Sequence, residues 1–220
     1  MYDRKTGVEL VRVLIFSGGK LNTWALSIIK EEDYLIGVDR GAYFLYSHGI
    51  EMNMAIGDFD SVTHEEKERI LAYSKKTISC DAFNKNETDT EMAYNYALTK
   101  QPKEIVLLGV LGNRFDHSIA NIQLLHSGLQ AGVDSKILDE WNEIQLVNSQ
   151  LVIHKSRFKN ISLLPMTSEV TGITLEGFLY PLNNATIKIG ESIGISNVLN
   201  GEIGKITVSS GILQVIKSND

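Results

Sequence analysis

The chain has 220 residues, of which 43% are hydrophobic and 22% are charged, and these values are typical of a folded globular protein with a sizeable core. Its formal net charge of −6 argues against the broad basic surface of a nucleic-acid-binding protein and favours small-molecule partners. The chain has a single cysteine, Cys80, no signal-peptide pattern near its first residue, and no apolar run of roughly the 18 residues that cross a bilayer, so we expect a cytoplasmic protein with no membrane partner.

Short β-branched runs alternate with segments of helical periodicity as far as about residue 140. Continuous apolar runs suit parallel strands that are covered on both faces, so buried strands are predicted at 11–16, 34–39, 52–57, 76–80, 104–109 and 135–138. Helices are predicted at 63–75 and 88–100, where Thr63 and Thr88 begin capping boxes, and from about residue 115 to 132. The alternation predicts an α/β domain with a doubly wound, mainly parallel sheet, whose ligands bind outside the carboxyl ends of the strands.

The pattern changes after residue 140. Strand-like segments separated by Gly, Asn, Ser and Pro are found at 142–148, 150–155, 160–166, 169–177, 185–190, 204–210 and 212–218. Their spacing predicts a C-terminal antiparallel β-sandwich domain. Ten of the eleven aspartates lie between Asp3 and Asp139, so carboxylate chemistry is expected in the first domain. Trp24, Trp141 and Cys80 are interpreted as packing residues.

Aspartates follow several of the predicted strands. The motif GDFDS places Asp58 and Asp60 two residues apart, where an extended chain would point both toward one face and a cation would relieve their repulsion. A solvated turn is the alternative, because Gly, Asp and Ser are common in turns. Asp39 and Asp116 also follow strands, and Asp89 lies in the first turn of a predicted helix. Carboxyl ends of parallel strands converge on one edge, so these carboxylates can share a Mg²⁺ site that bridges to substrate phosphates.

The segment LGVLGNRFDH supplies the candidate phosphate site. Gly109 and Gly112 would let backbone N–H groups approach a phosphate, and Arg114 offers a planar fork for bidentate contact. Asp116 could orient Arg114 or a metal-bound water. His117 at a helix start favours a structural hydrogen-bonding role over that of a catalytic base. The glycine spacing fits neither the dinucleotide-binding fingerprint nor the P-loop, which disfavours both of those enzyme classes.

Together these motifs resemble the thiamine pyrophosphokinase family over most of the chain. The resemblance is carried by DRGA at 39–42, GDFDS at 57–61, K-x-x-T-D at 85–89, G-x-x-G-x-R-x-D-H at 109–117, GISN at 194–197 and SSGILQVI at 209–216. It implies a catalytic domain that binds ATP and Mg²⁺ at 1–140 and a β-sandwich that binds thiamine and dimerises at 141–220. The implied reaction moves pyrophosphate from ATP to the hydroxyl of thiamine and releases AMP, and the implied assembly is a homodimer.

The resemblance also implies site residues. The catalytic residues would be Asp58, Asp60, Asp89, Arg114 and Asp116, and the metal ligands would be Asp39, Asp58, Asp60 and Asp89. The ATP-binding residues would be Asp39, Gly41, Lys85, Thr88, Gly109, Gly112, Arg114 and His117. The thiamine-binding residues would be Tyr180, Ser196, Asn197 and Ser210. We further expect each active site to combine the first domain of one subunit with the second domain of its partner.

Three positions depart from the family pattern, and two other functions stay open. Asn86 stands where many relatives carry Asp, Asn113 where they carry a second Gly, and Val198-Leu199 where Glu-Phe follow Ser-Asn. The side chain of Val198 accepts no hydrogen bond, which alters the expected thiamine pocket. The alternatives are a phosphotransferase or phosphatase of the haloacid-dehalogenase type, which also carries D-x-D after a strand, and a non-catalytic nucleotide or thiamine sensor. The proton acceptor is left open between Asp60 and Asp89, because a metal-bound carboxylate is a poor base.

Overall fold

The computed structural model describes residues 11–79 and 86–219. The chain divides into two compact units, with the division between Glu140 and Trp141. The positions of Cys80 and Lys85, which the sequence analysis singled out, lie outside the described residues. Among the described helices, none is both long enough and apolar enough to span a membrane.

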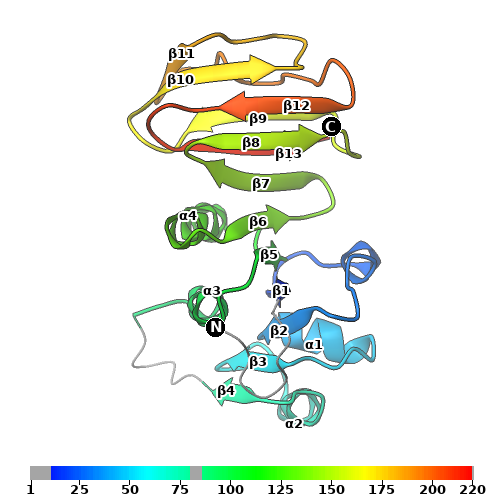
Figure 1. Ribbon diagram of the computed structural model, residues 1–220. Coiled ribbons are helices and arrows are strands. Elements are labelled where there is room, and N and C mark those ends of the chain that lie inside the picture. Colours follow the sequence, from blue (N-terminus) through cyan, green and yellow to red (C-terminus); the bar gives the residue numbers. More distant parts are fainter. Residues whose placement is uncertain (1–10, 80–85, 220) are drawn as a thin grey trace. The chain divides into compact units, whose positions relative to one another are not determined.

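The first unit is built on a parallel sheet with the strand order β4-β3-β2-β1-β5-β6 (Figure 1). The strands are β1 (Arg12–Phe16), β2 (Tyr34–Val38), β3 (Met54–Gly57), β4 (Thr77–Ser79), β5 (Glu104–Leu108) and β6 (Asp134–Leu138). Residues 13–16 of β1 and 105–108 of β5 are fully or almost fully buried, which explains their uninterrupted apolar sequences. The chain runs outward from β1 to β4 and then returns to β5 on the other side of β1. The point between β1 and β5 is therefore a topological switch point, where sheets of this kind bind ligands.

Helices cover both faces of this sheet, as the sequence predicted. They are η1 (Thr23–Leu26), α1 (Arg40–Ser47), α2 (His64–Ala72), α3 (Asp89–Thr99) and α4 (Phe115–Ala131). In Figure 1, α1 and α2 lie on one side of the strands and α3 and α4 on the other. Thr63 and Glu66 form the complete capping box that begins α2, and the Thr88 hydroxyl accepts a hydrogen bond from the backbone of Glu91 at the start of α3. The doubly wound α/β fold is confirmed.

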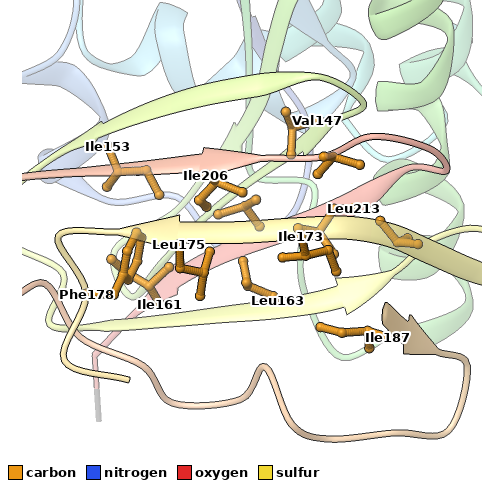
Figure 2. Close-up of a cluster of buried hydrophobic side chains, with 13 residues drawn as sticks. Val147, Ile153, Ile161, Leu163, Ile173, Leu175, Phe178, Ile187, Ile206 and Leu213 are labelled. Carbon is orange, nitrogen blue, oxygen red and sulfur yellow. The ribbon is translucent and has the colours of Figure 1, made fainter. Parts of the chain in front are cut away.

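The second unit consists of two antiparallel layers, β7-β13-β9 and β11-β10-β12-β8. Their strands are β7 (Asn142–Val147), β8 (Gln150–His154), β9 (Asn160–Pro165), β10 (Glu169–Glu176), β11 (Ala185–Lys188), β12 (Ile203–Thr207) and β13 (Leu213–Ser218). Buried residues recur at every second position in β9, in β12 and in the later half of β10, and the inward side chains form one apolar cluster (Figure 2). The predicted antiparallel β-sandwich is confirmed.

Candidate functional site

Three carboxylates from separate segments of the first unit meet at the carboxyl ends of β2 and β3. One oxygen each of Asp39, Asp58 and Asp89 lies within 4.8 Å of the others. Asp39 joins β2 to α1, Asp58 follows β3, and Asp89 is the first residue of α3. The structure thus brings together three of the four residues predicted as metal ligands. All three are partly buried.

The position of Asp39 depends on a strained local backbone. Asp39 has a φ of 47°, and one of its carboxylate oxygens accepts a hydrogen bond of 3.2 Å from the backbone N–H of Phe59. Gly57 has a φ of 147°, and a Cβ at this position would overlap the same carboxylate. Only glycine adopts this conformation readily and leaves the space that the carboxylate occupies.

The three carboxylates repel one another in the absence of a cation. Burial, followed by the negative charge of Asp89, raises the pKa of Asp39 to about 7, and the charge of Asp58 acts in the same direction. A divalent cation among the three oxygens would remove this repulsion. Mg²⁺ takes oxygen ligands and binds through one or two carboxylates together with substrate phosphates, so the donor set fits this ion.

Asp60 lies outside the carboxylate cluster, and the expectation of an extended segment at 58–60 is wrong. β3 ends at Gly57, and Phe59 has a φ of 60° with only 3% of its surface exposed. The chain therefore turns here, with Phe59 directed into the core. The backbone N–H of Asp60 donates to a carboxylate oxygen of Asp58 at 3.0 Å, and Asp60 is exposed. The solvated-turn alternative describes Asp60, and its role as a metal ligand stays a prediction.

A cleft of about 540 Å³ opens at the switch point of the sheet. Its lining comes from the segments that follow β1 and β5 and from α3 and α4: Ser17, Gly18, Gly19, Lys20, Thr90, Gly109, Val110, Leu111, Gly112, Asn113, Arg114, His117 and Asn121. The described lining residues include the cations Lys20 and Arg114 and no carboxylate. The cleft is therefore suited to an anionic ligand.

The two loops that form the cleft pack backbone against backbone. The N–H of Gly19 donates to the carbonyl of Gly109 at 2.8 Å, and a Cβ at Gly19 would overlap that carbonyl. Side chains of α4 hold the second loop: the Asn121 amide donates to the Val110 carbonyl at 2.9 Å, and the Ser118 hydroxyl accepts from the Gly112 N–H at 3.1 Å. The N–H of Gly112 is therefore occupied by Ser118, and the approach of other backbone N–H groups to a phosphate at Gly109 and Gly112 stays a prediction.

Arg114 and Asp116 form a two-point ion pair at the start of α4. Nε of Arg114 donates to one carboxylate oxygen at 3.0 Å and Nη2 to the other at 2.7 Å. The Arg114 hydrogen bonds lower the pKa of Asp116 to about 2. Asp116 is not a member of the carboxylate cluster, so of its two predicted roles the geometry favours orienting Arg114. His117 lies beside them in the lining of the cleft.

The remaining predicted ATP-binding residues have mainly structural surroundings. The Thr88 hydroxyl caps α3 by accepting from the Glu91 N–H at 3.1 Å. Gly41 is buried in the first turn of α1, where a Cβ would overlap the carbonyl of Phe16. Gly41 therefore allows α1 to approach β1, and its predicted contact with ATP is not apparent from its position. Lys85 lies outside the described residues.

In the second unit, Asn197 holds the backbone beside Tyr180. Its side-chain oxygen accepts from the backbone N–H groups of Tyr180 and Val198 at 3.1 and 2.9 Å, and its amide donates to the Tyr180 carbonyl at 2.7 Å. Asn197 is buried, whereas the Tyr180 residue is 63% exposed. Ser196 is also exposed, and its backbone N–H donates to the Ser162 hydroxyl at 3.1 Å. Asn197 thus positions Tyr180, and its own polar atoms are largely occupied.

Ser210 lies apart from the other predicted thiamine-binding residues. It pairs with Thr171 near the beginning of β10, whereas Phe178, beyond the end of that strand, pairs with Leu199. From Thr171 to Phe178 the chain spans up to roughly 23 Å, at about 3.3 Å per residue. The structure groups Tyr180 with Ser196 and Asn197 and does not bring Ser210 to them within one chain.

Several residues that line the cleft are not among the predicted site residues: Ser17, Gly18, Gly19, Lys20, Thr90 and Asn121. The signal for the first four was present, because S-G-G-K directly follows a buried strand and ends in a cation. Recognising it required the knowledge that β1 and β5 are neighbours at the switch point. Thr90 and Asn121 carry no such signal, because both lie within helices.

Comparisons with known proteins agree over both units. Residues 25–137 match the family model described as thiamin pyrophosphokinase, catalytic domain, and residues 148–213 match the one described as thiamin pyrophosphokinase, vitamin B1 binding domain. A thiamine pyrophosphokinase of Bacillus subtilis is 38% identical over 192 residues, which cover 86% of this chain and 89% of that protein.

Solved structures extend the likeness to the fold. A crystal structure of thiamine pyrophosphokinase from Bacillus subtilis matches with a TM-score of 0.89 at 35% identity, covering 95% of this chain and 99% of that one. A crystal structure of thiamin pyrophosphokinase from Geobacillus thermodenitrificans matches with a TM-score of 0.87 at 30% identity, covering 96% and 98%. The sequence matches to both domain models and to the Bacillus relative show that the chain belongs to the thiamine pyrophosphokinase family.

Proposed function

We propose that the chain transfers pyrophosphate from ATP to the hydroxyl oxygen of thiamine and releases AMP. The observation that carries this proposal is that the carboxylate cluster and the cationic cleft adjoin at two consecutive residues of α3. Asp89 belongs to the carboxylate cluster, and Thr90 lines the cationic cleft. A nucleoside triphosphate with its divalent cation needs such a pair of sites, one for the metal and one for the phosphates. The family matches identify the acceptor as thiamine.

We assign the metal to Mg²⁺ and its binding to Asp39, Asp58 and Asp89. Their oxygens lie close enough to share one ion. The pKa of Asp39 is raised by burial and by the neighbouring carboxylates, so a bound cation would be stabilising there. When bound, Mg²⁺ would neutralise charge on the phosphate oxygens.

The protein's own groups supply charge stabilisation and proton transfer. Lys20 and Arg114 lie in the cleft, where their charges would stabilise the transferring phosphates, and Asp116 holds the Arg114 fork. Of the two carboxylates considered as proton acceptor, Asp60 is the better candidate, because it lies outside the cluster, whereas Asp89 would be a metal ligand.

We further propose a homodimer in which Tyr180 and Ser196 of one subunit complete the site of the other. Leu179 and Ile195, which adjoin Tyr180 and Ser196 in the sequence, are exposed apolar side chains of the kind that an interface would cover, and they support this proposal. The cytoplasmic location stays a prediction.

The activity is tested with purified protein, ATP, Mg²⁺ and thiamine. Thiamine-dependent formation of AMP supports the proposal. Phosphate release without thiamine would indicate a phosphatase, and binding without turnover would indicate a sensor.

The carboxylate roles are tested by comparing Asp58→Asn with Asp60→Asn. Loss of a metal ligand costs roughly 3 kcal/mol of transition-state stabilisation, so Asp58→Asn should lower turnover by about a hundredfold and raise the Mg²⁺ concentration required. Asp60→Asn should lower turnover without changing the Mg²⁺ requirement. Asp134→Asn, an exposed carboxylate at the amino end of β6, is the matched control and should behave as wild type. Equal Mg²⁺ requirements in all three variants would contradict the metal assignment.

The shared site is tested by mixing Asp58→Asn protein with Tyr180→Ala protein. Tyr180 suits this experiment better than Asn197, whose three hydrogen bonds support the fold. In a two-fold dimer, about half of randomly exchanged dimers are mixed and half of their sites are intact, so activity should return to roughly a quarter of wild type. If mass spectrometry detects mixed dimers and activity stays absent, each site is built within one chain.

A further inference from the structure

A hydroxyl pair connects the two halves of the candidate site. Oγ of Ser17, which follows β1, lies 2.9 Å from Oγ1 of Thr90 in the first turn of α3. Ser17 is only 4% exposed, yet both residues line the cleft. The pair therefore lies at the inner wall of the cleft. Thr90 directly follows Asp89, which belongs to the carboxylate cluster.

The pair has a hydrogen-bond donor to spare. Two hydroxyls carry two protons, and their mutual hydrogen bond uses one of them. Within residues 11–79 and 86–219, neither hydroxyl forms another hydrogen bond. One O–H is thus available to an acceptor in the cleft, and a buried hydroxyl left without an acceptor is costly.

The charges around the pair define the acceptor. On one side the cleft carries Lys20 and no described carboxylate, and on the other side Asp89 begins the carboxylate cluster. A ligand atom bound at the hydroxyl pair would therefore lie between the cationic cleft and the carboxylate cluster. A phosphate oxygen satisfies both neighbours and accepts hydrogen bonds without donating any.

We infer that the Ser17–Thr90 hydroxyl pair donates a hydrogen bond to a phosphate oxygen of the nucleotide, at the junction between the metal-bound and cleft-bound parts of the triphosphate. This inference rests on the proposed function for the identity of the nucleotide. Its chemistry requires only a polyphosphate with a divalent cation, so it can be tested without thiamine.

The test measures binding of inorganic tripolyphosphate with Mg²⁺ by calorimetry. The double variant Ser17→Ala/Thr90→Val removes both hydroxyls with little change of shape and should bind about tenfold more weakly or worse, as expected for a lost hydrogen bond to a charged group. At least one of the single variants should account for most of that loss. Thr90→Ser keeps the hydroxyl and should bind within about threefold of wild type. Thr99→Val, at the other end of α3, is the control and should have no effect.

A second measurement separates phosphate contact from support of the metal site. Mn²⁺ alone is titrated and followed by electron paramagnetic resonance, while thermal unfolding verifies that the variants are folded. Unchanged Mn²⁺ affinity with weakened tripolyphosphate binding supports the inference. Wild-type tripolyphosphate affinity in the double variant would overturn it, even if the wild-type protein makes thiamine diphosphate. Equal loss of Mn²⁺ and tripolyphosphate affinity would also overturn it, because the pair would then serve only to hold Asp89.

Discussion

Replacing Asp39 by asparagine should stabilise the metal-free protein at alkaline pH and reduce its response to Mg²⁺. Burial and the nearby charge of Asp89 raise the pKa of Asp39 to about 7. A carboxyl group with a raised folded-state pKa prefers its proton in the folded protein. Its contribution to stability is therefore complete below the ordinary pKa near 4 and is lost as the pH rises through about 7. Asparagine carries no charge and keeps the oxygen that accepts from the Phe59 N–H.

The magnitude follows from the same pKa. The difference between about 7 and the ordinary 3.8 corresponds to an upper bound of roughly 4 kcal/mol, at about 1.4 kcal/mol per pH unit. Asp39 is only partly buried, so solvent screening reduces the expected effect to about 1 to 2 kcal/mol. For a chain of this size, that change raises the melting temperature by roughly 2 to 8 °C.

The assay is thermal unfolding of wild type and Asp39→Asn in EDTA at pH 5 and pH 8, repeated with Mg²⁺. At pH 5 Asp39 is largely protonated in the folded wild type and only part of its contribution to stability has been lost, so the melting temperatures should differ much less than at pH 8. At pH 8 the variant should melt higher without metal, and Mg²⁺ should stabilise the wild type more than the variant. If the variant melts lower at both pH values and Mg²⁺ stabilises both proteins equally, the cluster is not a site of unfavourable charge that a metal relieves.

Three further substitutions test the surroundings of the site. Gly57→Ala should lower the free energy of unfolding by about 2 kcal/mol or more and weaken Mg²⁺ binding, because the new Cβ overlaps the Asp39 carboxylate; urea unfolding and Mg²⁺ titration measure the two effects. Arg114→Lys keeps the charge and loses the fork, so the apparent KM for ATP should rise about tenfold or turnover should fall by as much; wild-type kinetics would remove Arg114 from the phosphate site. Asn197→Ala removes the two hydrogen bonds that the Asn197 side chain makes to the Tyr180 backbone, so it should lower the free energy of unfolding by about 2 to 3 kcal/mol; an unchanged midpoint in urea would refute this expectation.

The elements of the fold were predictable because their signals are local. The buried parallel strands appear as continuous apolar runs, and Thr63 and Thr88 mark the beginnings of two helices through their own hydrogen bonds. The convergence of Asp39, Asp58 and Asp89 was predictable for a related reason. Each follows a strand or opens a helix at the carboxyl edge of a parallel sheet, so their meeting follows from the type of sheet without knowledge of the strand order.

The parts that were missed depend on neighbours distant in sequence. Phe59 turns the chain and takes Asp60 out of the cluster, and the cause is the burial of an aromatic side chain that a D-x-D spacing does not reveal. The N–H of Gly112 is taken by Ser118 on the following helix. The loop after β1 joins the cleft only because β1 and β5 pair, which the order of strands along the chain does not imply.

The strand order also separates the charges of the site. Carboxylates follow β2 and β3 and open α3, on one side of the switch point, whereas Lys20 and Arg114 follow β1 and β5 at the switch point itself. Because β1 is the neighbour of β2, one ligand can place its metal among the carboxylates and its phosphates in the cleft. The negative and positive side chains then do not neutralise each other. Substitutions on the two sides should therefore have different signatures: changes in the carboxylates alter the dependence on metal, and changes in the cleft alter the affinity for phosphate. Asp116 follows β5 and pairs with Arg114, but it is not among the residues that line the cleft. The glycines and small polar residues of the lining therefore keep the cleft itself without a described carboxylate, which preserves this separation.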